Sequence, residues 1–276
     1  MSRILGFEMS NENNITILDV LIDAAQSMQR SEFRDDYTLQ GNFALTSLLY
    51  DRGFQKYERL TKDLDLDYSS KESWERFVDK CVNIFSDNSG LGLKFNLEKR
   101  RGFDKTKNEK GDSIALKASA INGEEFNFNI DMNIKPLSPK TFYTILGFSI
   151  EAIELIPLFM NKLDSLTTIK ICRRIKDFYD IYVISCVQDF LMKEILSGWN
   201  SMDKKMPITG VYILSPFSVD NLAHAYDKFY GIARKPSFEG LYTDVMDFVV
   251  PIFECIGKGR ENIRWISAER RWEICG

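Results

Sequence analysis

Residues 59–68, RLTKDLDLDY, place an aspartate at every second position. Asp63, Asp65 and Asp67 alternate with leucine and tyrosine. This period is typical of a β-strand, in which every second side chain leaves the same face. Aspartate is uncommon in strands, so its repetition along one strand face calls for a reason. The segment therefore predicts a strand whose carboxylates have a chemical use.

Asp63 and Asp65 carry the main prediction. Their side chains should leave the same face about 6–7 Å apart at the backbone. Two ionised carboxylates at that distance repel, and a pair of Mg²⁺ ions would compensate their charge. If the strand that carries Asp131 is a neighbour, three carboxylates converge in a ligand set for two-metal phosphoryl transfer. The alternative is a strand with one solvated polar face, and we expect Asp67 to be only its polar end.

The pattern outside this segment changes near residue 150. We predict an α/β (α+β) first half, residues 1–150, with strands at 37–40, 63–68, 93–101, 113–121 and 125–134, a further one at 140–148, and helices at 15–28, 43–51 and 70–85. The second half, residues 151–276, predicts a helical bundle with helices at 156–169, 173–187, 189–199, 218–231 and 241–256.

Composition sets the broad class. The 276 residues are 44% hydrophobic and carry a net charge of −4, which allows one large domain or two ordinary ones and gives no global basic field. The five cysteines are scattered without metal-site spacing, which favours a reducing compartment. The most apolar stretch, residues 141–160, contains Glu151, Glu154 and Pro157, so no membrane span is predicted. We expect a cytoplasmic protein.

Two further motifs have both a chemical and a structural interpretation. Gly41 and Asn42 follow a predicted strand and open a helix, a place where backbone N–H groups can bind an anion. The alternative is an ordinary turn in which Asn42 caps the helix. Lys162 lies on an apolar helix, and Asp177 and Asp180 share one face of the next helix. Surface charge with local ion pairs is the alternative for these three.

In their order along the chain, these motifs resemble those of the AbiEii/AbiGii toxins, which are nucleotidyltransferases of bacterial abortive-infection and toxin–antitoxin systems. Residues 37–68, YTLQGNFALTSLLYDRGFQKYERLTKDLDLDY, are similar to the family's strand, small-residue pair, helix and R-x-T/S-x-D-x-D strand. Residues 159–184, FMNKLDSLTTIKICRRIKDFYDIYVI, are similar to its lysine helix and the helix that follows.

The resemblance implies a nucleotidyltransferase-fold domain with a mixed sheet, followed by a helical bundle. It also implies roles for individual residues. It assigns catalysis to Asp63, Asp65, Lys162 and Asp177. It assigns nucleotide binding to Gly41, Asn42, Arg59 and Asp180, and metal binding to Asp63, Asp65 and Asp131. The expected cofactors are two Mg²⁺ ions, with GTP or a pyrimidine nucleoside triphosphate as the donor.

The expected function is a Mg²⁺-dependent toxin that transfers a nucleotidyl group to an RNA acceptor, such as the 3′ end of tRNA, with a cognate antitoxin as a possible partner. Asn42, where the family usually has Gly or Ser, keeps open a nucleotide- or partner-binding module without transfer activity. A small-molecule nucleotidyltransferase is a third alternative. Two basic segments, 98–110 and 257–273, are candidates for RNA contact. The alternative for segment 98–110 is a solvated hairpin, and the alternative for segment 257–273 is a docked terminal segment with buried tryptophans.

Overall fold

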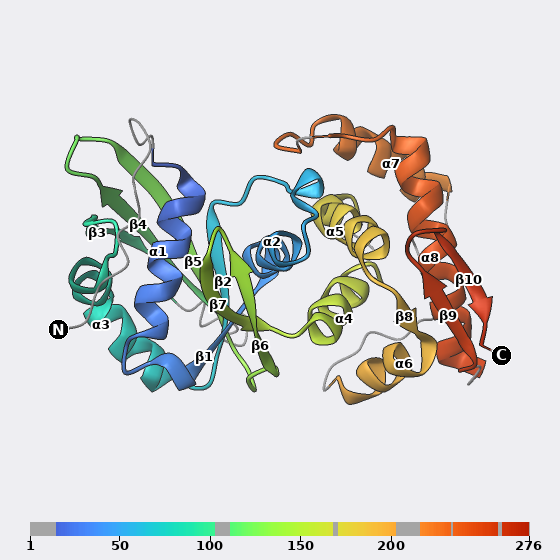
Figure 1. Cartoon of the computed structure of the whole chain (residues 1–276), viewed down its shortest axis with the longest axis horizontal. Helices are drawn as coiled ribbons and strands as arrows, with labels where there is room; N and C mark the ends of the chain where they lie inside the picture. The colour runs from blue at the N-terminus through green and yellow to red at the C-terminus, as the bar shows by residue number, and fades with distance from the viewer. Residues whose placement is uncertain are drawn as a thin grey trace.

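A computed structural model describes residues 15–102, 111–167, 171–202, 216–232, 234–258 and 261–275. The described chain forms two halves along the long axis of the molecule (Figure 1). The N-terminal half is built on a mixed sheet, and the C-terminal half is mainly helical.

The central sheet has five strands, in the spatial order β1 (Tyr37–Gln40), β2 (Asp63–Tyr68), β5 (Glu125–Ile134), β4 (Gly111–Ser119) and β3 (Lys94–Arg100). β2 and β5 run parallel, and the other neighbouring pairs run antiparallel. The predicted fold class, α/β with a mixed sheet, is therefore confirmed. The register sets Asp65 beside Asp131 and Asp63 beside Asn129, which brings the polar faces of β2 and β5 together.

Helices and a hairpin surround this sheet, namely α1 (Ile17–Gln29), α2 (Gly41–Asp51), α3 (Lys71–Asn88), β6 (Lys140–Ile145) and β7 (Phe148–Ile153). α1 begins with a capping box in which Thr16 and Asp19 satisfy each other's backbone N–H groups. Ser70 caps α3 by accepting a hydrogen bond from the Ser73 N–H group. α2 packs against β2 and β6 and also contacts the C-terminal half through α5.

The C-terminal half contains α4 (Leu155–Ser165), α5 (Ile175–Val187), α6 (Met192–Ser201), α7 (Pro216–Asp227) and α8 (Phe238–Lys258). It also holds a small antiparallel sheet that the sequence patterns did not predict, formed by β8 (Phe190–Leu191), β9 (Ile263–Ile266) and β10 (Arg271–Ile274). α4 starts two residues after β7 ends. The division into separate domains at residue 150 stays a prediction.

Trp265 of the basic segment 257–273 belongs to the core, and Trp272 packs against that core while partly exposed. Trp265 is 1% exposed, and its indole N–H donates to the Ser185 carbonyl at 2.7 Å. Trp272 stacks on Phe248 with ring centroids 5.8 Å apart and donates to the Phe248 carbonyl. The alternative of a docked terminal segment is therefore confirmed, with Trp265 buried and Trp272 partly buried. RNA contact by the arginines of this segment stays a prediction. Residues 103–110 of the other basic segment lie outside the described residues.

No helix within the described ranges is long and apolar enough to cross a membrane, and the stretch 141–160 forms a hairpin and the start of α4 instead.

Backbone and side-chain contacts join the two halves beside β2. The Leu60 N–H group donates to the Gly231 carbonyl at 2.7 Å, and Arg59 and Ile232 form an antiparallel bridge. The Tyr179 hydroxyl donates to the Tyr57 carbonyl at 3.1 Å. These contacts place the segment that leads into β2 against α5 and the residues that follow α7.

Candidate active site

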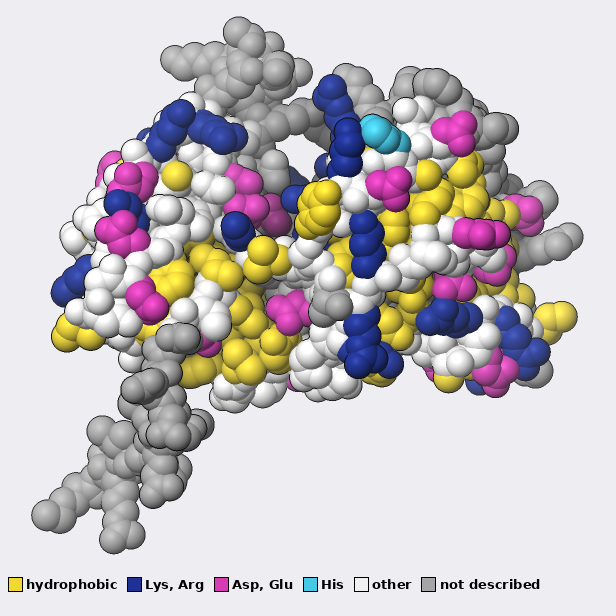
Figure 2. Space-filling model, turned by 90° about the horizontal axis from the view of Figure 1, so that it is seen from above, with side chains coloured by type: hydrophobic (Ala, Val, Ile, Leu, Met, Phe, Trp, Pro, Cys, Tyr) yellow, Lys and Arg dark blue, Asp and Glu magenta, His cyan; other side chains and the backbone are white. Residues whose placement is uncertain are grey.

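A cleft of about 780 Å³ lies between the two halves. Lys, Arg, Asp and Glu side chains gather around the hollow between the halves (Figure 2). Seven predicted site residues line the cleft, namely Gly41, Asn42, Arg59, Asp63, Asp65, Lys162 and Asp177. β2 supplies the two aspartates, the start of α2 the glycine and asparagine, α4 the lysine and α5 Asp177. Segments separated by more than 130 residues therefore meet around one space.

Asp131, the predicted third carboxylate, lies beside Asp65 but is not arranged with the other two as a set of metal ligands. Asp131 is beside Asp65 in the sheet register and is not among the residues that line the cleft. Asp63 accepts a hydrogen bond from the Asn129 amide at 2.8 Å. Within the described part of the chain, no three His, Cys, Asp or Glu side chains are arranged to hold a metal ion. The role of Asp131 as a metal ligand therefore stays a prediction.

Burial and neighbouring acids make Asp65 an unusual carboxylate. Burial is the largest effect and raises its pKa, Asp131 and Asp63 raise it further, and Lys162 and Arg59 oppose the shift. The net result is a pKa of about 6. In the chain alone, Asp65 thus lacks enough positive charge to offset its burial and its acidic neighbours.

Gly41 lies directly against this carboxylate. Its φ of +69° is in the left-handed region, and a Cβ atom at this position would lie 1.9 Å from the Asp65 Oδ2 atom. Only glycine fits without moving Asp65. The start of α2, with the backbone N–H groups of its first turn and the positive end of the helix dipole, is thereby adjacent to the paired carboxylates.

Gly41→Ala should destabilise the protein more than Gly53→Ala does. Both glycines have left-handed backbones, and a Cβ at Gly53 would meet nothing within 4 Å. Gly53→Ala should therefore cost only the conformational strain, about 1–2 kcal/mol. Gly41→Ala should cost a further ~1–3 kcal/mol because Asp65 must move. Urea unfolding measures both variants, and equal losses of unfolding free energy would contradict the close contact.

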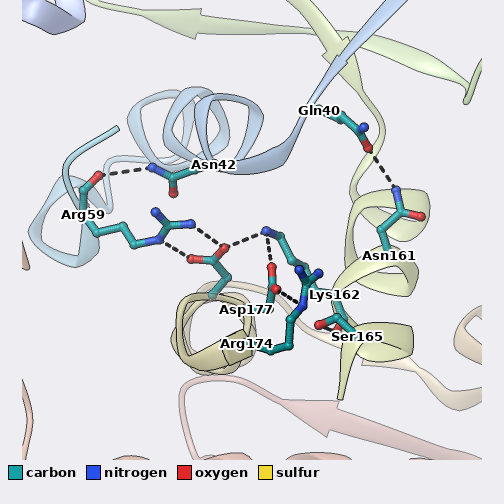
Figure 3. Close-up of polar contacts among 9 residues, drawn as sticks. Gln40, Asn42, Arg59, Asn161, Lys162, Ser165, Arg174 and Asp177 are labelled. Atoms are coloured by element: carbon teal, nitrogen blue, oxygen red, sulfur yellow. Dashed lines mark hydrogen bonds and ion pairs between the residues drawn. The ribbon is translucent and has the colours of Figure 1, made fainter. Parts of the chain in front are cut away.

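The Asn42 side chain does not act as the helix cap. α2 begins at Gly41, and Gln40 occupies the cap position. The Asn42 amide nitrogen instead donates to the Arg59 carbonyl at 3.4 Å (Figure 3). Asn42 is 6% exposed. The interpretation of Asn42 as an N-cap is therefore wrong, and its amide ties the start of α2 to the segment before β2.

A buried ion-pair network links the segment before β2 to α4 and α5. Asp180 is fully buried and accepts two hydrogen bonds from the Arg59 guanidinium, at 2.7 and 2.9 Å. It also pairs with the Lys162 ammonium at 2.8 Å. Burial alone would raise the pKa of Asp180, but the charges of Arg59 and Lys162 lower it to about 2. Asp180 lies outside the cleft lining and pairs with both of these cations. Its role in nucleotide binding stays a prediction.

Lys162 and Asp177 pair with each other at the cleft. The Lys162 ammonium donates to the Asp177 Oδ1 atom at 2.7 Å, and Arg174 contacts the Oδ2 atom at 2.8 Å (Figure 3). Burial disfavours the charged form of Lys162, but Asp180 and Asp177 raise its pKa above the usual value. The ammonium has three N–H donors, and these contacts with Asp177 and Asp180 engage two of them. Arg174 and Asp177 thus form the local ion pair that was the alternative for this helix. Lys162 is buried, so it does not carry a surface charge.

Asp67 differs from the other two aspartates of β2. It is fully buried, pairs with the Lys135 ammonium at 3.1 Å and accepts a hydrogen bond from Ser138. Asp67 lies outside the cleft lining, and as the polar end of β2 it is buried rather than solvated. Burial, the largest effect, raises its pKa against the influence of Lys135.

Sequence reasoning missed most of the positive charge of the cleft. Besides Arg59 and Lys162, the lining includes Lys62, Lys135, Arg173, Arg174, Lys176 and Lys228. These residues come from separate segments, and the RRIK run at 173–176 was the only local signal. The cleft thus combines a small acidic centre with a cationic rim, an arrangement that suits metal ions and phosphates together.

Comparison with known proteins identifies the family. The sequence model of the nucleotidyl transferase AbiEii toxin family, of the type IV toxin–antitoxin systems, matches residues 24–195. The chain belongs to this family, and it is a nucleotidyltransferase. The predicted family is thereby confirmed. The match spans α1 to α6 and contains every residue that the sequence predicted for the site.

Solved structures include a similar protein. The nucleotidyltransferase toxin MenT4 from Mycobacterium tuberculosis has a TM-score of 0.48 and 14% sequence identity, and the alignment covers 86% of this chain and 92% of that one. The comparison with curated proteins gives no match.

Proposed function

We propose that this protein is a Mg²⁺-dependent toxin that transfers a nucleotidyl group from a nucleoside triphosphate to RNA. One observation carries the proposal: the cleft joins the Asp63 and Asp65 carboxylates, the glycine-led start of α2 and the Lys162 ammonium in one lining. This combination suits a bound triphosphate, since phosphate oxygens need both cations and backbone donors.

The chain's own residues would divide the work as follows. The backbone N–H groups at Gly41 and Asn42 would bind the terminal phosphates, the part that leaves as pyrophosphate. Lys162 would donate its remaining N–H to the reacting phosphate, where negative charge increases in the transition state. Asp177 and Asp180 would hold Lys162 in place, and Arg59 would hold Asp180 against the segment that leads into β2.

The acidic centre fits magnesium. Mg²⁺ in phosphoryl-transfer sites is commonly held by one or two carboxylates, with substrate phosphates and water completing its shell. Asp63 and Asp65 would supply these carboxylates, with Asp131 as the third. The raised pKa of Asp65 is the behaviour expected of a carboxylate that needs a cation beside it. When bound, the metal would polarise the phosphate and lower the pKa of the attacking hydroxyl.

The rim favours an RNA acceptor over a small molecule. Lys135 and Arg174 pair with Asp67 and Asp177, and Lys62, Arg173, Lys176 and Lys228 add further positive charge to the cleft of a chain whose net charge is −4. Nucleic acid backbones bind such cationic grooves. The 3′ end of tRNA is the proposed acceptor, and GTP or a pyrimidine nucleotide is the proposed donor. These substrates would place the action of the toxin in the cytoplasm.

Labelling tests the proposal. Purified protein is incubated with Mg²⁺, total tRNA and each of the four nucleoside triphosphates labelled at the α-phosphate. Label should enter RNA with one or two donors. Tight nucleotide binding without label in any acceptor would favour a binding module, and label in small metabolites but not in RNA would favour a small-molecule enzyme. Either result would overturn the proposed reaction.

Magnesium should stabilise the protein in a pH-dependent way. Since the pKa of Asp65 is raised from 3.8 to about 6, its contribution to stability is favourable below pH 4 and is lost as the pH rises through 6. At pH 7.5 the ionised carboxylate is a cost that Mg²⁺ offsets. Millimolar Mg²⁺ should raise the melting temperature by roughly 2–4 °C at pH 7.5 and by less at pH 5. An equal rise at both values, or one retained in Asp65→Asn, would contradict this role.

A further inference from the structure

We propose that Tyr230 is the surface on which a nucleobase stacks at the mouth of the cleft. Tyr230 lines the cleft, and 82% of it is exposed. It lies outside residues 24–195, the range that the family sequence model matches. The inference rests on the proposed function, because it requires a nucleotide or an RNA strand in the cleft.

The backbone holds Tyr230 beside the segment that leads to the acidic centre. The next residue, Gly231, accepts a hydrogen bond from the Leu60 N–H group at 2.7 Å. Leu60 precedes Asp63 by three residues. The backbone at Gly231, which contacts Leu60, therefore lies within ~10 Å of the backbone at Asp63. A base attached to a phosphate at the carboxylates would therefore lie within reach of the Tyr230 ring.

Glycine makes this close approach possible. Gly231 has a φ of +85°, and a Cβ atom there would lie 3.1 Å from the Leu60 Cβ atom. The turn that presents Tyr230 is thus defined by its sequence and by a contact between the two halves. A ring on such a fixed backbone loses little conformational freedom when a ligand binds.

The surroundings of the ring suit a nucleobase. The Lys235 ammonium lies 6.0 Å from the Tyr230 ring centroid and donates to the Tyr226 carbonyl, which fixes the lysine. Lys228 lines the cleft two residues before Tyr230. An exposed aromatic ring beside lysines is an arrangement by which proteins bind unpaired bases, with the ring stacking on the base and the lysines contacting the phosphates. A protein partner would use the ring without any need for this positive charge.

Binding measurements on three variants test the role. Calorimetry with Ca²⁺ in place of Mg²⁺ prevents turnover, and the probes are the four nucleoside triphosphates, inorganic triphosphate and total tRNA. Tyr230→Ala should weaken binding about 5- to 100-fold. If the affected probe is a nucleoside triphosphate, the base belongs to the donor; if it is tRNA, the base belongs to the acceptor. Inorganic triphosphate has no base, so its affinity should not change.

Two controls complete the test. Tyr230→Phe keeps the ring and should bind within about 2-fold of the wild type, whereas Phe142→Ala removes an exposed ring of β6 outside the cleft lining and should change nothing. If Tyr230→Ala binds the nucleoside triphosphates and tRNA as tightly as the wild type does, this inference alone is overturned. An equal loss of affinity in Tyr230→Phe and Tyr230→Ala would also overturn it, because the first variant keeps the ring. A wild-type chain that binds neither nucleotide nor tRNA would overturn the proposed function as well.

Discussion

Asp65→Asn is expected to lower the rate of nucleotidyl transfer by about 10²- to 10³-fold. The substitution keeps the shape of the side chain and removes the negative charge that would hold the metal ion and, through it, the triphosphate. Losing a single charge-stabilising contact at a reacting group typically costs 10²–10³-fold in rate. Asp63→Asn should have an effect of the same order, because both carboxylates line the cleft. The measurement is the initial rate of label transfer to tRNA at saturating nucleotide.

Asp67→Asn is the matched control on the same strand. Asp67 lies outside the cleft lining, and burial already raises its pKa, so a neutral amide should fit at little cost. We expect its transfer rate to stay within about 10-fold of the wild type, since any effect would come only through Lys135. Equal losses in Asp65→Asn and Asp67→Asn would show that strand stability, and not metal binding, explains the first result.

Asp180→Ala is expected to lower the free energy of unfolding by about 3–5 kcal/mol. Asp180 is fully buried and is the shared partner of Arg59 and Lys162, so its removal leaves two buried cations with too little compensating charge. Urea unfolding at pH 7 measures the effect. Glu32→Ala removes an exposed carboxylate that pairs with Lys80 and Arg76 and should leave the stability almost unchanged.

The pH dependence identifies the cause of this loss. The pKa of Asp180 is about 2, against an ordinary value of 3.8, so its contribution is complete above pH 4 and is lost as the pH falls toward 2. The difference between the wild type and Asp180→Ala should therefore shrink over that interval. A difference that stays constant between pH 7 and pH 2 would indicate lost packing rather than lost charge pairing.

Local patterns were sufficient for the strand and its paired aspartates. The period of two in RLTKDLDLDY fixed which side chains share a face, and the structure has β2 at 63–68 with Asp63 and Asp65 in the cleft lining. The glycine at the start of α2 was also visible, because a glycine between a predicted strand and a helix allows close approach to backbone N–H groups. The placement of Lys162 and Asp177 opposite this strand required the family resemblance, because spacing along the chain says nothing about contacts between distant segments.

The remaining features depend on tertiary contacts. Asp67 and Asp180 look like surface charges in the sequence, and their burial depends on Lys135 and Arg59, which lie on other segments. The cationic rim is collected from separate parts of the chain. The small sheet was missed because β8, β9 and β10 have only two to four residues each, too few for a period to be recognised.

A crystal structure of the protein with Mn²⁺ and a non-hydrolysable analogue of its best donor nucleotide tests the central claim most directly. The anomalous signal of Mn²⁺ locates the metal independently of the nucleotide density. We predict Mn²⁺ at the Asp63 and Asp65 carboxylates, with the triphosphate between the start of α2 and the Lys162 ammonium. Metal or triphosphate bound outside this cleft would contradict the account.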